Sequence, residues 1–288
     1  MTTVPHRLLD LPIVNCHHRD EGLVVLSKRT DRALHERPSY VALHALSLVS
    51  EGEQVVYADD QRRLRIPTGG VGLLRRGLYT ITDLLADASG GFAATVVFFD
   101  DACLREALAA LGSSVDAAVP TRVLAAAPAA HAWVDTLSRP PEQPGPPEAG
   151  AQRAWRRRFA ELLECLVADE PALLGALHGL LATPRRPLRD FMRAHFDKPL
   201  TLADYAHLTG RSERSFRRDF RARFGESPKK WLVARRLERA HELLHAPASP
   251  PVHAIAEEVG YASASHFIKL YRERFGVTPG AVAATVAG

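Results

Sequence analysis

The sequence is poor in cysteine, and its three cysteines, Cys16, Cys103 and Cys165, lie far apart. They form no Cys-x-x-Cys pair, so they indicate neither a disulfide framework nor a zinc site. No stretch reaches the roughly 20 consecutive apolar residues that a membrane-spanning helix needs, and residues 1–20 contain no apolar signal-peptide core. We therefore expect a protein of the reducing cytoplasm that does not enter a membrane.

Catalytic and phosphate-binding motifs are missing as well. Gly69-Gly70 is followed by no P-loop lysine, and no Ser/His/Asp signature occurs. A metal-dependent cupin enzyme needs three or more convergent ligands, and His35 and His44 are the only candidates near the first relevant strand. We predict no catalytic residue, no metal and no other cofactor. One alternative stays open, a cupin-type enzyme with an accessory DNA-binding domain; bound metal lost on substitution of His35 or His44 would favour it.

The chain divides into two parts of different charge. Its 288 residues are 46% hydrophobic and 24% charged, with a net charge of +4, which is typical of a globular protein. Residues 1–150 carry 14 Lys and Arg against 18 Asp and Glu, whereas residues 188–288 carry 17 against 11. An acidic N-terminal part and a basic C-terminal part indicate two domains with different partners. We place the boundary near Pro187, which gives domains 1–187 and 188–288.

The first hundred residues have the pattern of short β-strands separated by turns, which predicts a β-barrel or jelly roll. The predicted strands are Leu23–Leu26, Val41–Val49, Gln54–Ala58, Leu64–Ile66, Val71–Leu74, Leu78–Thr82 and Phe92–Phe99. Beyond them, residues 101–111 and 121–137 are rich in Ala and Leu and are predicted to be helical. Five prolines within residues 139–150 predict an exposed loop or linker.

An apolar stripe follows this loop within residues 152–182. Its members recur at helical spacing and are Trp155, Phe159, Leu162 and Leu166, with a second apolar helix from Pro171 to Leu181. Two interpretations are open. The stripe is a coiled-coil seam that joins two chains into a homodimer, or it packs on the barrel of its own chain.

Residues 200–288 contain an internal repeat. Seven residues recur 51 positions later: Ser212, Phe216, Arg221, Arg223, Phe224, Gly225 and Pro228 correspond to Ser263, Phe267, Arg272, Arg274, Phe275, Gly276 and Pro279. Upstream, Ala206 and Gly210 recur 50 positions later as Ala256 and Gly260. So many matches in register indicate two copies of one small unit.

Each copy has the organisation of a helix-turn-helix. In the first copy a short helix, Leu202–Thr209, is followed by Gly210, where the chain leaves the helix through a left-handed residue. Ser212 then caps the next helix. That helix carries an aromatic stripe at i, i+4 and i+8, formed by Phe216, Phe220 and Phe224. The second copy repeats this order from Val252, with Phe267, Tyr271 and Phe275 as its stripe.

The opposite, exposed face of each capped helix is polar. In the first copy it holds Arg214, Arg217, Arg218 and Arg221, and in the second Ser265, His266, Lys269 and Arg272. An α-helix fits the major groove of DNA, and Arg can donate two hydrogen bonds to guanine. Residues near the helix N-terminus reach bases, whereas later ones meet phosphates. We predict base contacts from Arg214, Arg217, Arg218, Ser265, His266 and Lys269. Arg221 and Arg272 are predicted to contact phosphates. The alternative is that these side chains are only the solvated faces of two amphipathic helices.

A helix is predicted between the two copies, from Trp231 to His245, begun by Ser227 as N-cap and Pro228 at the first helical position. A rigid helix here would fix the separation of the two capped helices. Major-groove segments on one face of a duplex lie about 34 Å apart. One chain is thus predicted to read two consecutive grooves of an asymmetric site.

Several motifs of the second half are specific to one family. They are the Ala206–Gly210 turn, Ser227-Pro228, Ile255-Ala256-x-x-Val259-Gly260-Tyr261, Ser265-His266-Phe267 and Phe275-Gly276-Val277-Thr278-Pro279. Through them the segment from Leu188 to Ala284 resembles the DNA-binding domain of AraC/XylS-type bacterial transcription regulators. The resemblance implies a cytoplasmic regulator of promoter DNA, usually an activator that contacts RNA polymerase. Asp219 departs from the pattern, because the family commonly has an apolar residue there, and looser packing beside Phe220 is expected.

The front of the chain fits the same family. It resembles a cupin barrel, the usual sensory domain, in two turns, Val49–Glu53 and Ile66–Gly69. The overall layout, particularly Leu188–Met192, is similar to that of activators that control type III secretion genes. The resemblance implies an α+β chain, in which a cupin-like β-barrel with a helical dimerisation segment precedes an all-α domain of two helix-turn-helix units. The barrel would receive a small-molecule or protein effector, between which the sequence does not choose.

Overall fold

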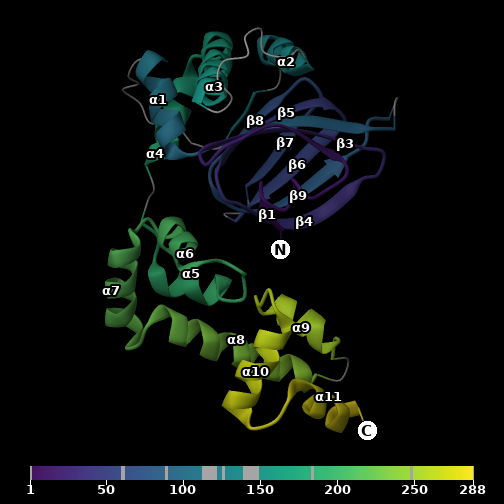
Figure 1. The fold of residues 1–288 in the computed structure, drawn as a ribbon, viewed down its shortest axis with the longest axis vertical. Helices are drawn as coiled ribbons and strands as arrows, with labels where there is room; N and C mark the ends of the chain where they lie inside the picture. Colours follow the sequence, from purple (N-terminus) through teal and green to yellow (C-terminus); the bar gives the residue numbers. More distant parts are fainter. Residues whose placement is uncertain are drawn as a thin grey trace. The chain divides into compact units, whose positions relative to one another are not determined.

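The chain forms two compact units, the N-terminal unit Met1–Ala182 and the C-terminal unit Thr183–Gly288 (Figure 1). The computed structural model describes residues 2–59, 62–87, 90–111, 122–124, 127–138, 149–182, 185–246 and 249–287. The division falls a few residues before Pro187, where the sequence placed the boundary. Most of the proline-rich segment, residues 139–148, lies outside the described residues.

The N-terminal unit contains two β-sheets, one with strand order β1-β4-β9-β6-β7 and one with order β11-β8-β5-β10-β3-β2. Only β1 and β4 pair in parallel among the recorded pairings, and the others are antiparallel. The strands are β1 (Thr2–Val4), β2 (Val14–Arg19), β3 (Leu23–Thr30), β4 (Leu34–Val41), β5 (His44–Glu51), β6 (Glu53–Ala58), β7 (Arg63–Ile66), β8 (Val71–Leu74), β9 (Gly77–Leu84), β10 (Phe92–Phe99) and β11 (Arg122–Leu124).

The sheets share an apolar core that both supply, with Val41 and Val56 from one sheet and Leu26 and Phe98 from the other. This two-sheet arrangement agrees with the expected cupin-like barrel, and the α+β organisation is confirmed. Two details of the sequence prediction are wrong. The single strand predicted at Val41–Val49 is two strands, since the chain crosses from one sheet to the other after Val41. A helix was predicted over 121–137, but residues 122–124 form β11 and pair with β8.

The six-stranded sheet is covered on both faces. Along β10, Phe92, Val96 and Phe98 join the core between the sheets, while Val97 and Phe99 face a second apolar cluster. Successive side chains of a strand point to opposite faces, so a strand buried on both sides must be apolar or have its polar groups hydrogen-bonded. Seven of the eight residues of Phe92–Phe99 are apolar and all eight are buried, and the hydroxyl of the exception, Thr95, lies 3.1 Å from that of Ser27.

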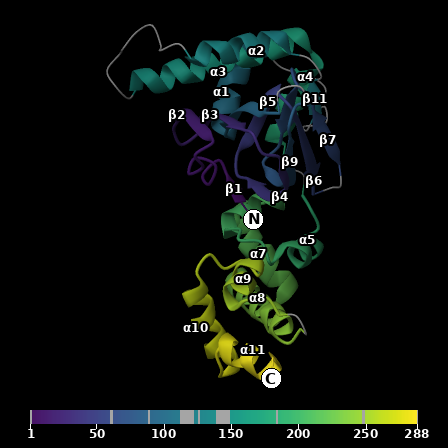
Figure 2. The same cartoon turned by 90° about the vertical axis from the view of Figure 1, so that its right-hand side faces the viewer.

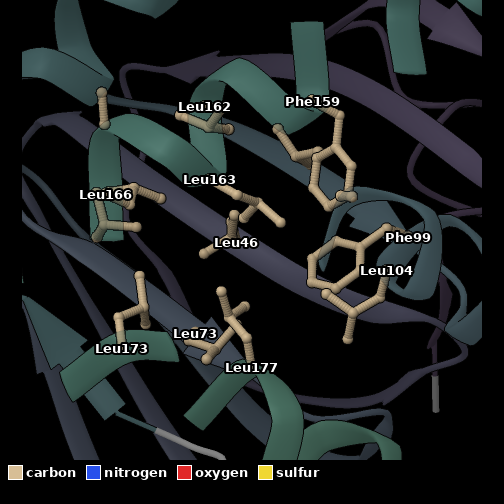
Figure 3. Close-up of a cluster of buried hydrophobic side chains, with 14 of the residues drawn as sticks. Leu46, Leu73, Phe99, Leu104, Phe159, Leu162, Leu163, Leu166, Leu173 and Leu177 are labelled. Atoms are coloured by element: carbon tan, nitrogen blue, oxygen red, sulfur yellow. The ribbon is translucent and has the colours of Figure 1, made fainter. Parts of the chain in front are cut away.

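Four helices cover the outer face of this sheet (Figures 1 and 2). They are α1 (Asp101–Leu111), α2 (Pro128–Asp135), α3 (Ala149–Asp169) and α4 (Ala172–Leu181), with a 3-10 turn η1 (Thr136–Ser138) after α2. Figure 3 shows side chains from α3 and α4 lying against those of the strands. Phe159, Leu162 and Leu166 of α3 are at most 1% exposed, and the Phe159 ring lies 4.8 Å from that of Phe99. The stripe therefore packs on the sheet, and its interpretation as an exposed coiled-coil seam is wrong.

The described part of the C-terminal unit is helical. Its helices are α5 (Leu188–His195), α6 (Leu202–Leu208), α7 (Glu213–Phe224), α8 (Pro228–Leu244), α9 (Val252–Glu258), α10 (Ala264–Phe275) and α11 (Pro279–Ala287). The pairs α6–α7 and α9–α10 are the two copies of the repeat, and α8 runs from one pair to the other (Figure 1). The aromatic stripes lie inside each copy, since Phe216, Phe220, Phe267 and Tyr271 have no exposed surface.

The turns and caps follow the sequence prediction. Gly210 and Gly260 adopt left-handed φ values of 69° and 88°, a conformation that side chains disfavour. A Cβ on Gly260 would also lie 2.5 Å from the carbonyl oxygen of Asp197. The hydroxyls of Ser212 and Ser263 accept hydrogen bonds from backbone N–H groups of α7 and α10. The helix-turn-helix organisation of both copies is thus present.

Packing of α3 on the sheet predicts the effect of removing one aromatic ring. Phe159→Ala should lower the free energy of unfolding of the N-terminal unit by about 3–5 kcal/mol, because it leaves a cavity in a dry core. Urea titration of the full-length chain, followed by hydrogen exchange of peptides from β5 and β10, measures this change. Arg157→Ala is the matched control, because the side chain of Arg157 on the same helix is 84% exposed, and it should change stability by less than about 0.5 kcal/mol. Equal effects of the two substitutions would contradict the packing.

Candidate nucleic-acid interface

Helix α7 presents its four predicted contact residues to solvent. Arg214, Arg217, Arg218 and Arg221 are all exposed, opposite the buried Phe216 and Phe220. Arg217 pairs with Glu213 at 3.3 Å and Arg218 with Asp219 at 3.1 Å, whereas Arg214 and Arg221 have no ion-pair partner among the described residues. Surface pairs of this kind contribute little to stability, so both paired guanidinium groups can exchange a carboxylate for a phosphate or a base.

Asp219, the departure from the family pattern, has a structural role. Its carboxylate accepts a hydrogen bond from Arg211 Nε at 3.2 Å, and the side chain of Arg211 is only 5% exposed. Arg211 also donates to the carbonyl oxygens of Thr209 and Arg186. Burial opposes ionisation of Asp219, but the hydrogen bonds from Arg218 and Arg211 outweigh it and lower its pKa. Asp219 thus fixes α7 to the turn that precedes it.

Packing beside Asp219 is tight, and the expectation of looser packing is wrong. Phe220 has no exposed surface. Its ring centroid lies 4.2 Å from that of Phe224 and 5.6 Å from that of Trp231. The polar residue is accommodated because its partner, Arg211, is supplied by the turn.

Helix α10 exposes the second predicted set, Ser265, His266, Lys269 and Arg272. Lys269 Nζ lies 4.0 Å from Glu273 Oε1. The backbone N–H of His266 donates to the capping hydroxyl of Ser263. A shallow hollow on this face is lined by Ser265, Ile268, Lys269, Arg272, Glu273 and Thr278.

The same face also carries Ile268, which the sequence prediction did not include and whose side chain is 37% exposed. The 51-residue offset of the repeat places Arg214, Arg217, Arg218 and Arg221 onto Ser265, Ile268, Lys269 and Arg272. His266, which was predicted, corresponds to the half-buried Ser215. The repeat therefore relates Ile268 to Arg217, but the sequence prediction considered only polar side chains.

One side chain of α8 connects the two copies. Arg236 Nε donates to the carbonyl oxygen of Phe196 at 2.7 Å, and its Nη1 donates to that of Gly260 at 3.0 Å. Its Nη2 donates to the carbonyl oxygen of Lys198. The guanidinium thus joins the loop after α5 to the glycine turn of the second copy.

Tyr205 completes this junction from α6. Its hydroxyl donates to the carbonyl oxygen of His195 at 2.8 Å. Burial raises the pKa of Tyr205 to about 12, although the charge of Arg236 opposes the rise. The phenol therefore stays protonated at neutral pH and remains a donor.

The N-terminal unit does not bring its two candidate metal ligands into a ligand cluster. His35 is exposed on β4. His44 on β5 is buried, with Nε2 2.9 Å from Asp101 Oδ1 and Nδ1 accepting the backbone N–H of Arg76. Both ring nitrogens of His44 are thus engaged within the protein. Throughout the part of the chain that the structure describes, no group of three His, Cys, Asp or Glu residues is placed to hold a metal ion.

A buried polar cluster lies between the sheets, and the sequence prediction did not include it. Lys28 Nζ donates to both carboxylate oxygens of Asp83, at 2.9 and 2.8 Å, and Arg37 pairs with the same carboxylate. Gln54 Nε2 donates to Asp83 Oδ1 at 2.8 Å, and Gln54 Oε1 accepts from the Ser47 hydroxyl. Burial lowers the pKa of Lys28, which the charge of Asp83 opposes. Two cations face one anion, and Arg37 Nε is buried without an acceptor.

The geometry agrees with comparisons to known proteins. The family described as a helix-turn-helix domain matches residues 205–285. The HTH-type transcriptional regulator ExsA of Pseudomonas aeruginosa is 34% identical over 129 residues, 41% of this chain and 46% of that protein. The virulence regulon transcriptional activator VirF of Yersinia enterocolitica is 36% identical over 124 residues, 42% of this chain and 45% of that protein. The chain therefore spans about half the length of the curated relatives it matches.

A solved structure is similar to the same region. The crystal structure of a transcriptional regulator with an AraC-type DNA-binding domain from Chromobacterium violaceum is 33% identical, with a TM-score of 0.31, and the match covers 35% of this chain and 88% of that one. The C-terminal unit is a helix-turn-helix domain. Its sequence motifs resemble those of the AraC type, and the family match and the named regulators agree with that resemblance. Among the described residues, no helix is both long and apolar enough to span a membrane.

The junction at Arg236 predicts the result of its removal. Arg236→Ala should lower the free energy of unfolding of the C-terminal unit by about 1–3 kcal/mol, because part-buried carbonyl groups lose their donors. Arg235→Ala is the matched control, since the neighbouring side chain is 50% exposed and interacts with Glu238 and the Trp231 ring without bridging the two copies. Urea unfolding of the full-length chain, monitored by hydrogen exchange within α6 and α9, distinguishes the two variants. Similar losses from both would show that the junction does not hold the copies together.

Proposed function

We propose that this chain is a sequence-specific DNA-binding transcriptional regulator that acts as an activator. The observation that carries the proposal is the pair of capped helices, α7 and α10, each exposing one face opposite a buried aromatic stripe in an AraC-type domain. Two relatives are named a transcriptional regulator and a transcriptional activator, which supports the same class. We propose double-stranded promoter DNA as the ligand and two consecutive major grooves as the places where the helices lie.

The residue roles follow from position along each helix. Bases would be contacted from the N-terminal half by Arg214, Arg217, Arg218, Ser265, His266 and Lys269. Phosphates would be contacted by Arg221 and Arg272, one turn further on. All eight side chains are exposed, which this role requires. The alternative is that these faces are only solvated, in which case none of the four arginines of α7 contacts a nucleic acid.

The N-terminal unit is proposed to carry the regulatory input. A small pocket lies between the sheets, and its lining combines Lys28, Arg37, Ser47 and Gln54 with apolar side chains. We propose it as the place where a group of a small-molecule effector binds, and a protein effector is the alternative. The names of the relatives indicate regulators and not enzymes, and His44 has no free nitrogen with which to bind a metal.

The remaining partners are proposals from the family resemblance. We propose RNA polymerase as the partner of the DNA-bound chain, a cytoplasmic location, and type III secretion genes as the class of target. A homodimer through residues 152–182 would have to use the outward faces of α3 and α4, because the apolar stripe is buried in the unit.

Selection of duplexes by the full-length chain tests the function. Duplexes enriched from a random-sequence pool should share an asymmetric sequence, and footprinting should protect two segments about one helical turn apart on one face of the duplex. If the chain enriches no sequence, or binds all duplexes equally at moderate salt, the proposed function is wrong.

Two neighbouring arginines of α7 should respond differently to truncation. Arg218→Ala should weaken binding to the selected duplex by about 1–3 kcal/mol and relax the preference at one or two base pairs, because a guanidinium can pair bidentately with guanine. Arg221→Ala should weaken binding to all sequences alike and reduce the slope of log K against log salt by about 1. Fluorescence anisotropy on the selected duplex and on single-base variants, over a range of salt, separates the two. Identical preferences and slopes would refute the division between base and phosphate contacts.

A further inference from the structure

The internal repeat places an apolar residue in the position of a DNA-contacting arginine. Ile268 in α10 corresponds to Arg217 in α7 through the 51-residue offset that also relates Phe216 to Phe267 and Arg221 to Arg272. Both residues are exposed. The two copies therefore share one fold and one exposed position, but they differ in the chemistry that this position presents.

An isolated exposed apolar side chain is common and needs no functional explanation. The surroundings of Ile268 set it apart. It is the one exposed apolar residue on α10, all of whose residues the structure describes. Its exposed neighbours are Ser265 three residues before it, Arg272 four residues after it and the adjacent Lys269, and these four residues line one hollow. A β-branched side chain is a weaker helix former than Lys or Gln, so helix stability gives no reason to place isoleucine there.

The edges of the bases in the major groove offer one apolar group. Guanine, cytosine and adenine present donors and acceptors, whereas thymine presents an acceptor and its 5-methyl group. An isoleucine held against a base edge makes its most favourable contact with such a methyl group, because its side chain has no hydrogen-bonding atom and would leave a polar edge unpaired. We propose that Ile268 recognises a thymine in the half-site of α10 through its 5-methyl group. The inference rests on the proposed function, since it requires α10 to lie in the major groove.

The roles of the neighbouring residues follow. Lys269 and Arg272 flank the contact with positive charge, and Ser265, nearer the N-terminus, is free to hydrogen bond to an adjacent base. The first copy, with Arg217 at the same position, favours a guanine contact there. One chain thus reads a guanine-type feature in one groove and a thymine-type feature in the other.

Deoxyuridine substitution tests the proposal, because deoxyuridine differs from thymidine only by the missing methyl group. The probe is the duplex selected by the full-length chain, in which each thymine in turn is replaced by deoxyuridine. Wild-type chain should lose about three- to tenfold in affinity at one thymine of the half-site protected by α10. Ile268→Ala should bind the unmodified duplex weaker by a similar factor and should be indifferent to deoxyuridine at that position. Ile268→Val should retain part of the dependence on the methyl group.

A second exposed apolar residue supplies the control. Val277 is 47% exposed in the segment after α10, outside the helix face, and Val277→Ala should keep the full deoxyuridine penalty. If Ile268→Ala shows the same deoxyuridine profile as the wild type, or if no thymine of the half-site is sensitive, the inference is wrong. It is also wrong if Ile268→Ala leaves DNA affinity unchanged and lowers only transcription of a reporter, because Ile268 would then contact a protein.

The failure of this inference can be told apart from that of the proposed function. If no duplex is enriched by the wild-type chain, the proposed function fails and the inference fails with it. If a duplex is enriched and footprinted, and deoxyuridine penalties are the same with and without Ile268, the proposed function stands and only the thymine contact is overturned.

Discussion

The hydrogen bonds of Arg236 hold together the arrangement of helices on which the proposed DNA recognition depends. A fixed separation favours entry of both helices into consecutive grooves, because free motion between them lowers the effective concentration of the second helix at its groove. Helix α8 sets the distance, and Arg236 on α8 joins the loop at Phe196 and Lys198 to the turn at Gly260. Gly260 cannot be replaced without displacing that loop, since a Cβ there would meet the carbonyl oxygen of Asp197.

The C-terminal unit was predictable from the sequence because its determinants are local. Glycine at a left-handed turn, serine at an N-cap and aromatic residues at i, i+4 and i+8 each act within one or two helical turns, and the repeat shows them twice. Arg236 was not predictable, because its partners lie 24 to 40 residues away and nothing in the local pattern distinguishes it from Arg235. Asp219 was misjudged for the same reason. Its effect depends on Arg211, eight residues earlier in the preceding turn.

The N-terminal unit was predicted less well, because strand pairing is not local. Strand β2 has a polar, largely exposed pattern, and β11 has only three residues, so neither has a strong periodic signal. The stripe of α3 left two interpretations open, since apolar residues at helical spacing describe a helix that packs on a sheet as well as one that packs on a partner. Burial of Phe159 and Leu162 decides between them. The ion cluster at Asp83 joins residues 28, 37, 54 and 83, which no sequence spacing brings together.

The two copies of the repeat also show that one exposed position can carry a polar residue in one copy and an apolar residue in the other. Duplication fixes the backbone of both helices and therefore the positions that face a ligand, but it leaves the side chains at those positions free to diverge. A pair of identical helices would favour a direct repeat of one sequence in the two grooves. Under the proposed function, arginine in one copy and isoleucine in the other instead favour two different half-sites. Two different half-sites would determine which helix lies in which groove.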